Sequence, residues 1–273
     1  MIKKNILNQY NNGDKMNLLI TGASSGIAKD VIEKIKHKNI NIYPTVHTYK
    51  ELINIGKKYE RYPNIHPIKI DVTSDKDKQK LGNLDIDILL CNAAVGYGGS
   101  ISEIPISLLK ENFEVNVFSN FEIVQIVLKK MISKKEGKII MMSSLAGIYP
   151  IPFLGSYSAT KASIIQLSKA LRKELKLLDV HIPVVLIEPG FYKTGFNLVM
   201  FENKYDSFDH SYFKDKEENI RKKEEFILQF LGKKNLNSIS KCIIDAILKQ
   251  NPKKIYRAPF LQKVGIFLYK IIS

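Results

Sequence analysis

The feature that most constrains this chain is an apolar run that leads directly into a glycine-containing turn and then into a helical pattern. Residues 16–21 form a short, mainly apolar run, Gly22 and Gly26 follow, and apolar side chains then recur at helical spacing to residue 35. Glycine lets the backbone turn sharply after a strand and approach a pyrophosphate, whose charge is favourable at the N-terminus of a helix. Such a turn is often only a turn, so its position after a first parallel strand is what makes it a candidate phosphate site.

The alternation of apolar strands and amphipathic helices continues along the chain. Further strands are expected at residues 41–46, 65–71, 86–91, 137–142, 182–187 and 254–257. Helices are expected at residues 51–59, 106–130 (one or two helices), 157–178, 217–231 and 238–250. Nearly continuous apolar strands separated by helices are typical of a parallel sheet that is covered on both faces. The sequence therefore predicts an α/β fold with a doubly wound parallel sheet, in three α/β/α layers.

Length and pattern together predict one domain with a short segment at each end. The 273 residues, 45% of them hydrophobic, suffice for one sizeable domain with a buried core. Residues 1–15 form a polar leader, with Met16 as an alternative natural start, and residues 16–258 form the domain. Residues 191–231 break the alternation beyond a strand end, where a lid over a substrate would sit.

The net charge of +15 raises the question of nucleic-acid binding. Only four of the 42 basic residues are arginine, whose forked guanidinium is favoured for phosphate and base recognition, and the lysines are spread over the chain. We therefore expect no nucleic-acid partner. The basic, amphipathic segment 259–273 could rest on an anionic membrane surface, but packing against the core or a second subunit is favoured.

The cysteines and the start of the chain bear on its location. Cys91 and Cys242 lie 151 positions apart without C-x-x-C or Cys/His spacing, so neither a zinc site nor a disulfide framework is indicated. No apolar stretch reaches the roughly 18 residues that suggest a membrane span, and residues 1–15 lack the apolar core of a signal peptide. The sequence predicts a cytoplasmic protein without a metal site.

A phenol and an ammonium lie one helical turn apart at Tyr157 and Lys161. A nearby cation lowers the pKa of a phenol from about 10 toward neutral pH, which makes tyrosine a usable acid or base. Tyr212 and Lys216 have the same spacing but lie in the polar excursion, whereas Tyr157 opens a strongly helical run. We therefore favour the first pair; the alternative for Lys161 is a solvated helix lysine.

Ser144 follows the fifth expected strand, thirteen positions before Tyr157. Side chains at the carboxyl end of a parallel strand meet the crevice above the sheet, so this hydroxyl could hydrogen-bond a substrate carbonyl. The alternative is a polar strand end that caps a helix, which would be favoured if Tyr157 were absent.

These residues stand in an order that resembles the short-chain dehydrogenase/reductase family. The resemblance covers residues 17–194. Residues 21–27 are similar to the family's cofactor glycine motif, residues 71–72 to its adenine contact, and residues 92–94 to its central Asn-Ala-Gly element. The catalytic tetrad of the family is matched by Asn116, Ser144, Tyr157 and Lys161. The segment that holds the nicotinamide carboxamide is resembled by Pro189, Gly190 and Thr194.

The resemblance implies a Rossmann fold and hydride transfer between a nicotinamide cofactor and a small-molecule carbonyl or alcohol substrate. Tyr157 would give or take the proton, Ser144 would orient the substrate oxygen, and Lys161 would bind the nicotinamide ribose and lower the tyrosine pKa. Asn116 would hold a water that links Lys161 to solvent; the alternative is an amide that satisfies helix backbone. The implied cofactor contacts are Gly22, Ser24, Ser25, Gly26, Ile27, His47, Asp71, Val72, Asn92, Ala93, Ala94, Tyr157, Lys161, Pro189, Gly190 and Thr194.

The resemblance also implies a homodimer or homotetramer, as its members commonly are. A second class of function stays open, namely a non-catalytic dinucleotide-binding regulator or scaffold with the same fold, although the filled tetrad argues against it. Ala28, Ala94 and Cys91 depart from the family pattern, and Cys91 is better explained as a buried small residue than as a redox switch. The helix between residues 71 and 92 should be truncated.

The end of the second strand bears on the choice between NADP(H) and NAD(H). A carboxylate there accepts hydrogen bonds from a ribose 2′-hydroxyl, whereas basic and hydroxyl groups accommodate a 2′-phosphate. Residues 43–50 contain no acid, and His47 stands where related NADP-dependent reductases often carry arginine. We therefore favour NADP(H), with NAD(H) as the alternative because a neutral histidine is a poor phosphate ligand.

The excursion after residue 190 is rich in large apolar side chains that would lie near the expected crevice. They are Phe196, Leu198, Val199, Met200, Phe201, Tyr205, Phe208, Tyr212 and Phe213. An aromatic lid predicts an apolar substrate, such as an acyl, lipid-like or steroid-like compound. The alternative, that these residues cover the domain's own core, is nearly as well supported by the sequence.

Overall fold

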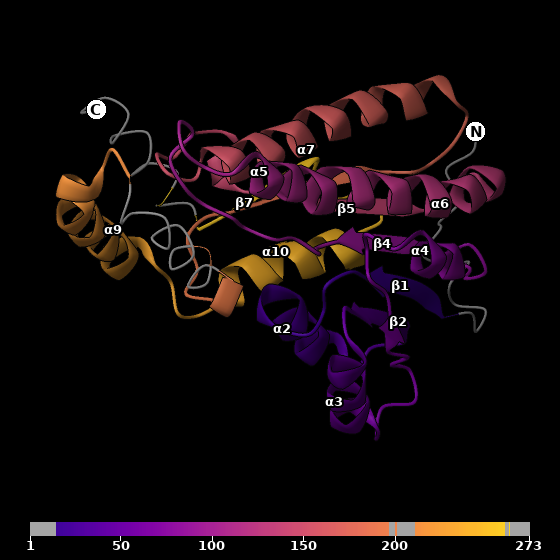
Figure 1. Ribbon diagram of the computed structural model, residues 1–273. Helices are drawn as coiled ribbons and strands as arrows, with labels where there is room; N and C mark the ends of the chain where they lie inside the picture. Colours follow the sequence, from indigo (N-terminus) through magenta and orange to yellow (C-terminus); the bar gives the residue numbers. More distant parts are fainter. Residues whose placement is uncertain (1–14, 197–199, 201–210, 260–261, 263–273) are drawn as a thin grey trace.

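The computed structural model describes residues 15–196, 200, 211–259 and 262, and these form one sheet of seven parallel strands flanked by helices (Figure 1). The strand order is β3-β2-β1-β4-β5-β6-β7. The strands are β1 (Met16–Ile20), β2 (Ile40–Val46), β3 (Ile68–Lys69), β4 (Ile88–Cys91), β5 (Lys138–Met142), β6 (Val184–Pro189) and β7 (Ile255–Ala258). The expected fold class, a doubly wound parallel sheet in three layers, is confirmed.

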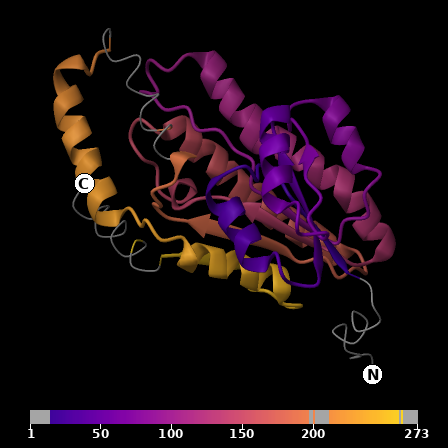
Figure 2. The same ribbon diagram turned by 90° about the horizontal axis from the view of Figure 1, so that it is seen from below.

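Helices cover both faces of this sheet. They are α2 (Gly26–Ile35), α3 (Tyr49–Tyr59), α4 (Asp75–Leu81), α5 (Ile106–Phe113), α6 (Ser119–Lys134), α7 (Gly155–Glu174), α9 (Glu217–Leu231) and α10 (Asn237–Leu248). Helices α2, α3 and α10 lie on one face, and α4, α5, α6 and α7 lie on the other (Figure 1). Helix α9 lies at the periphery, beyond these layers (Figure 2).

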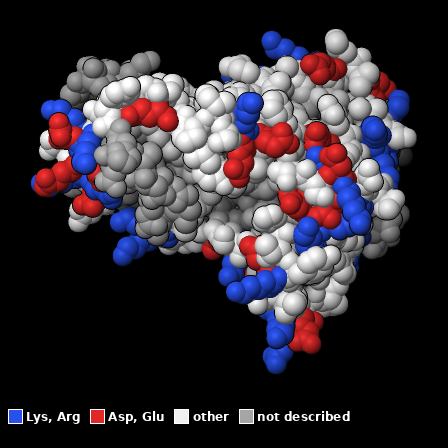
Figure 3. Space-filling model, viewed as in Figure 1, with Lys and Arg blue, Asp and Glu red and all other residues white. Residues whose placement is uncertain are grey.

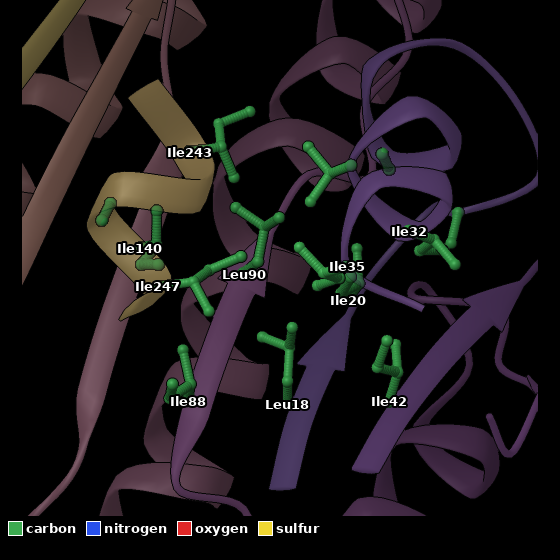
Figure 4. Packing of buried hydrophobic residues seen from close by; sticks show 14 of the residues in the cluster. Leu18, Ile20, Ile32, Ile35, Ile42, Ile88, Leu90, Ile140, Ile243 and Ile247 are labelled. Carbon is green, nitrogen blue, oxygen red and sulfur yellow. The ribbon is translucent and has the colours of Figure 1, made fainter. Parts of the chain in front are cut away.

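The core is divided by the sheet into two clusters, because successive side chains of a strand point to opposite faces. Leu18 and Ile20 of β1 pack toward α2 and α10, whereas Leu19 between them packs on the other face. Figure 4 shows the first cluster, in which Ile243 and Ile247 of α10 lie over the strands. This two-sided burial explains why the strands read as nearly continuous apolar runs.

The order in which strands are added to the sheet changes direction at β1, and this change determines where a crevice lies. Strand β1 pairs with β2 on one side and with β4 on the other. The connections that leave β1 and β4 therefore run over opposite faces of the sheet and separate at the carboxyl ends of the strands. Ligands of such sheets bind at this switch point.

One expected strand is much shorter than predicted. Residues 65–71 were expected to pair along their length, but β3 holds only Ile68 and Lys69, and Ile65 forms an isolated bridge to Ile42. Pro67 stands between the two paired stretches and has no N–H to donate to a strand ladder, which explains the interruption. The sequence prediction was wrong in extent at this edge.

The segment from residue 106 to 134 holds two α-helices separated by a π-helical turn. The turn η2 (Glu114–Phe118) joins α5 to α6. Among the described residues there are also three 3-10 segments, η3 (Leu145–Gly147), η4 (Leu175–Leu177) and η6 (Lys214–Lys216). Helix α4 has seven residues, as short as the sequence led us to expect.

The expected leader lies outside the described residues except for residue 15, and the amphipathic segment 259–273 does so except for residues 259 and 262. In the ranges that are described, no helix is long and apolar enough to cross a membrane. On the face drawn in Figure 3, basic and acidic side chains are intermixed.

Candidate active site

A cleft of about 570 Å3 lies at the carboxyl ends of the central strands. It brings together every residue that the sequence singled out for catalysis or cofactor binding except Asn116. The members are Gly22, Ser24, Ser25, Gly26, Ile27, His47, Asp71, Val72, Asn92, Ala93, Ala94, Ser144, Tyr157, Lys161, Pro189, Gly190 and Thr194. They come from the carboxyl ends of six strands, β1 to β6, and from the segments that follow them, so the parallel sheet is what makes them neighbours.

The glycine turn after β1 has the geometry that requires glycine. Gly22 has a φ of 63° and lies so close to β4 that a Cβ would be 2.7 Å from the Cα of Ala93. Gly26, with a φ of 59°, begins α2, and a Cβ there would meet no atom within 4 Å. The N-cap residue of α2, Ser25, makes no side-chain cap hydrogen bond. The first N–H groups of α2 thus have no capping side chain where the helix meets the cleft, as a bound anion requires.

Hydrogen bonds around Thr21 join the ends of β1 and β4 and fix the floor of the cleft. The hydroxyl of Thr21 accepts hydrogen bonds from the N–H groups of Asn92 (2.9 Å) and Ala93 (3.0 Å). The side-chain amide of Asn92 donates in return to the carbonyls of Thr21 (3.1 Å) and Gly22 (2.9 Å). The sequence analysis placed Thr21 in the glycine motif but did not find these contacts, because its partners lie about seventy positions away along the chain.

Asn116 lies behind the cleft wall rather than in it. Its side chain is fully buried in the π-helical turn η2. The amide oxygen accepts a hydrogen bond from Val95 N (2.8 Å), and the amide nitrogen donates to Val95 O (2.9 Å) and to the hydroxyl of Thr160 (3.1 Å). The side chain thus satisfies the backbone of the loop after β4, whereas the alternative had named helix backbone, and Val95 lines the cleft.

Asn120, one helical turn further on, was missed by the sequence analysis. Its side-chain amide donates to the carbonyls of Ala93 (3.0 Å) and Asn116 (3.1 Å), so it ties the π-helical turn to the end of β4. A π-helical turn offsets the backbone hydrogen bonds by one residue and often occurs at functional sites. No local sequence signal marks this turn.

Tyr157 and Lys161 lie side by side on α7, and both are buried. The Lys161 Nζ is 5.5 Å from the centre of the Tyr157 ring and donates to the carbonyl of Met142 (3.2 Å). Burial lowers the pKa of Lys161 to about 8. Burial also raises the pKa of Tyr157 well above its ordinary value, although a hydrogen bond with Ser144 opposes this rise. In this structure, burial of the phenol outweighs the lowering that the sequence led us to expect from Lys161.

Ser144 caps a short helical turn and also lines the cleft. Its hydroxyl accepts a hydrogen bond from Ala146 N (3.1 Å) and so caps η3. The same side chain lines the cleft beside Tyr157 and lies 3.5 Å from the carbonyl of Pro189. By contrast Tyr212, the competing tyrosine, is 86% exposed and does not line the cleft.

A polar corner forms one end of the cleft at β2 and β3. The Nε2 of His47 is 3.3 Å from a carboxylate oxygen of Asp71. Burial raises the pKa of Asp71, but hydrogen bonds from Thr73 and the nearby His47 imidazole bring it below its usual value. The carboxylate of Glu51 lies next to this corner and accepts from the N–H groups of His47 and Thr48, both at 3.0 Å. The search for an acid that sets cofactor preference covered residues 43–50 and so did not include Glu51. The spacing of Thr48 and Glu51 is that of a capping box, which could have drawn attention to this carboxylate.

The other end of the cleft is apolar. Ala146, Leu154, Tyr157 and Met200 form a buried cluster, against which Ile151, Phe191 and Phe196 pack. The rings of Tyr157 and Phe196 are 5.9 Å apart. Of the expected lid residues, Phe196 and Met200 line the cleft, whereas Leu198, Val199, Phe201, Tyr205 and Phe208 lie outside the described residues.

Residues 211–213 are attached across the chain to the loop before α5. Glu103 accepts hydrogen bonds from the hydroxyl of Ser211 and from Tyr212 N, both at 2.8 Å. The ring of Phe213 packs edge-on against Phe153 with 5.1 Å between centres. We call residues 211–213 together with Glu103 and Phe153 the clasp.

Comparison with known proteins agrees with this geometry. Residues 16–204 match the family of short chain dehydrogenases. The chain belongs to the short-chain dehydrogenase/reductase family. This match includes the glycine turn, Ser144, Tyr157, Lys161 and Gly190, whereas α9, α10 and β7 lie beyond it.

Two relatives have names that describe a reduction at carbon 3. An NADPH-dependent 3-dehydrocapnine reductase from Ornithobacterium rhinotracheale is 36% identical over 191 residues, which cover 64% of this chain and 65% of the relative. A 3-ketodihydrosphingosine reductase from Bacteroides thetaiotaomicron is 32% identical over 185 residues, which cover 66% of this chain and 65% of the relative. In both cases the similarity spans just under two thirds of the relative's own length.

A solved structure shares the fold over nearly the whole chain. It is a short-chain dehydrogenase/reductase from Burkholderia phymatum in complex with NAD, with a TM-score of 0.77 and 20% sequence identity. The superposition covers 94% of each chain. At this identity the likeness concerns the Rossmann fold alone.

Proposed function

We propose that this protein is an NADP(H)-dependent oxidoreductase that reduces the carbonyl group of an apolar, long-chain 3-oxo compound, with Tyr157 as the proton donor. One observation carries the proposal. A single cleft contains the glycine turn with its uncapped helix, the buried group of Ser144, Tyr157 and Lys161, and an apolar end. The first part suits a dinucleotide, the second suits proton transfer and the third suits an apolar substrate.

The residues present fit a dinucleotide. Gly22 lets the backbone after β1 pass close to Ala93, and no atom lies near the position of a Cβ on Gly26. The turn therefore leaves room for a pyrophosphate at the start of α2. We assign the pyrophosphate to residues 22–27, the adenine to Asp71 and Val72, and the nicotinamide carboxamide to Pro189, Gly190 and Thr194. A bound nicotinamide supplies or accepts the hydride.

The proton chemistry belongs to this chain's own side chains. Because burial raises the pKa of Tyr157, the phenol stays protonated at neutral pH and can donate to a carbonyl oxygen. Ser144 would hydrogen-bond the same oxygen, and Lys161 would bind a ribose hydroxyl. For Asn116 we propose a positioning role, since its side chain holds Val95 and Thr160.

Two observations support NADP(H) over NAD(H). One relative is named as NADPH-dependent. In addition, the two carboxylates near the end of β2 have donors of their own, because Asp71 is next to His47 and Glu51 binds backbone N–H groups. Glu51 is nevertheless the group that would favour NAD(H), since a carboxylate can accept from a ribose hydroxyl.

The substrate class rests on the apolar end of the cleft and on the relatives. The cluster around Tyr157 and Phe196 offers apolar contact next to the proton donor. Both relatives are named for reduction at carbon 3. The name of one gives 3-dehydrocapnine as the compound reduced, and the name of the other gives 3-ketodihydrosphingosine. We further propose that residues 16–258 form the catalytic domain, that residues 191–231 include the substrate lid, and that the protein is a homodimer or homotetramer in the cytoplasm.

The proposal is tested by cofactor titration followed by a reductase assay. The purified protein is titrated with NADPH and with NADH, and the preferred cofactor is then used with 3-ketodihydrosphingosine, a 3-oxoacyl thioester and a short-chain ketone. We expect tight NADPH binding and oxidation of NADPH with a long-chain 3-oxo compound. Binding without turnover on any of these compounds would instead support a non-catalytic dinucleotide-binding regulator, and absence of nucleotide binding would refute the proposal.

A further inference from the structure

A glutamine near the end of the chain reaches the loop that follows β6. Gln262 is only 2% exposed, although it lies beyond the last strand. Its side-chain oxygen accepts a hydrogen bond from Phe191 N (2.6 Å), and its side-chain nitrogen donates to Phe191 O (3.1 Å). One amide thus binds both polar groups of the same backbone residue, as a neighbouring strand would.

The residue before Phe191 is shaped to receive this glutamine. A Cβ on Gly190 would overlap the side-chain oxygen of Gln262 and would lie 3.2 Å from a methyl of Leu145. Gly190 N also donates to the carbonyl of Ala258 (2.8 Å), so the loop continues the pairing of β6 with β7. Gly190 therefore gives Gln262 access to the backbone of Phe191.

The loop held in this way is part of the cleft. Pro189, Gly190 and Phe191 line it together with Ser144 and Tyr157, whereas Gln262 is not among the lining residues. The carbonyl of Pro189 lies 3.5 Å from the hydroxyl of Ser144, so a shift of the loop would also disturb that side chain. Gln262 contacts the wall of the cleft from behind.

We propose that Gln262 is a positioning residue that holds the loop 189–191 in the shape that receives the nicotinamide half of the cofactor. The inference rests on the proposed function, because that function assigns the nicotinamide to this loop. Gln262 lies beyond residues 16–204, which match the family. A residue outside that region would thus help to shape the cofactor site.

The first test separates the two halves of the cofactor. Gln262→Met keeps the length of the side chain but removes both hydrogen bonds to Phe191, so we expect the Kd for NADPH to rise about tenfold. Binding of adenosine 2′,5′-bisphosphate, which lacks the nicotinamide, should change less than twofold. Gln125→Met, at an exposed position of α6, is the matched control.

The outcomes of this test are distinct. Unchanged NADPH binding in Gln262→Met would overturn the inference, as would an equal loss for both ligands, which would mean a general loss of structure. If the unaltered protein itself binds no NADPH, the proposed function fails and the inference fails with it. A loss confined to NADPH supports the positioning role.

A second variant keeps the inference testable if Gln262→Met does not fold. Gln262→Glu has nearly the same shape, and its carboxylate cannot donate to Phe191 O. A protonated carboxyl group restores the donor while its carbonyl still accepts from Phe191 N, and burial raises the pKa of a carboxyl group. The Kd for NADPH of this variant, divided by that of the unaltered protein, should therefore fall toward one between pH 8 and pH 5.5. A ratio that does not change with pH would contradict the inference.

Discussion

Tyr157 and Lys161 are both buried, and both are protonated at neutral pH. The same loss of water raises the pKa of the phenol and lowers that of the ammonium to about 8. A protonated phenol next to a group that is still charged suits proton donation to a carbonyl oxygen. These protonation states agree with the proposed role of Tyr157 as a proton donor.

Removing the phenol hydroxyl should separate chemistry from binding. Tyr157→Phe deletes the proton donor and keeps the ring that packs on Phe196, so we expect kcat to fall by roughly 10²–10⁴-fold with the Kd for NADPH nearly unchanged. Tyr212→Phe is the matched control, because this exposed tyrosine has the same spacing to a lysine. Substantial activity in Tyr157→Phe would show that another group supplies the proton.

The rate of carbonyl reduction should depend on pH above neutrality. The pKa of Lys161 is lowered to about 8, so the ammonium is charged below that pH and loses its proton as the pH rises through it. We expect kcat/KM for reduction to be constant near pH 6–7 and to fall above about pH 8, while the raised pKa of Tyr157 keeps the phenol protonated there. A pH profile of kcat/KM that stays flat to pH 10 would contradict this role of Lys161.

The polar corner at β2 should set cofactor preference. His47→Asp places a second carboxylate beside Asp71, so a 2′-phosphate would be repelled and the ratio of the Kd values for NADPH and NADH should rise about tenfold. His66→Asp is the control, since His66 stacks on Tyr43 and does not line the cleft. An unchanged ratio in His47→Asp would remove His47 from the determinants of preference.

At the scale of helices and strands, apolar periodicity could predict nearly all of the described elements. It places α7 within four residues of its observed ends, because burial of one helix face fixes where apolar residues fall. Apolar periodicity could not reveal the π-helical turn η2. Over these five residues the backbone hydrogen bonds span five positions instead of four, and the apolar pattern does not show this change. The contacts of Thr21, Asn120 and Gln262 were missed for another reason, because their partners lie 27 to 72 positions away.

A buried lysine binds the C-terminal end of α10, and its replacement should lower the free energy of unfolding. Lys138, at the start of β5, donates to the carbonyls of Ile247 and Lys249, both at 2.7 Å. Lys138→Met leaves these carbonyls without that donor, so we expect a loss of about 1–3 kcal/mol in the free energy of unfolding, measured by urea denaturation. Lys241→Met, on the exposed side of α10, should change it by less than about 0.5 kcal/mol. Equal stability of the two variants would mean that the cost of burying Lys138 cancels its hydrogen bonds.

At the scale of the whole molecule, the parallel sheet gathers the site and the clasp attaches a distant segment to it. Residues near 22, 92, 144 and 190 meet because every strand ends at the same edge of the sheet. The clasp joins positions 108 and 109 residues apart through the carboxylate of Glu103. Sequence alone could predict that gathering, since it follows from topology, but not the clasp, which depends on one side chain in a loop.

Loss of the Glu103 carboxylate should loosen residues 211–213. Glu103→Ala removes the acceptor of Tyr212 N, so we expect hydrogen exchange at the Tyr212 amide to become about tenfold faster, in line with the loss of one charge-assisted hydrogen bond. Glu111→Ala is the control, because Glu111 binds Tyr97 and not residues 211–213. Equal exchange rates in Glu103→Ala and the unaltered protein would mean that the clasp does not hold this segment.

The strand order has a consequence for the way this protein is synthesised. When β4 emerges from the ribosome it finds the free edge of β1, and β5, β6 and β7 then join in the order in which they are made. No strand has to be inserted between two that are already paired, so the sheet can grow during translation as the chain lengthens. The glycine turn after β1 is thus formed first, Tyr157 and Lys161 follow, and Gln262 is made after β7. A nascent chain that ended before residue 262 would hold all seven strands but lack the side chain that contacts the loop 189–191, to which we assign the nicotinamide.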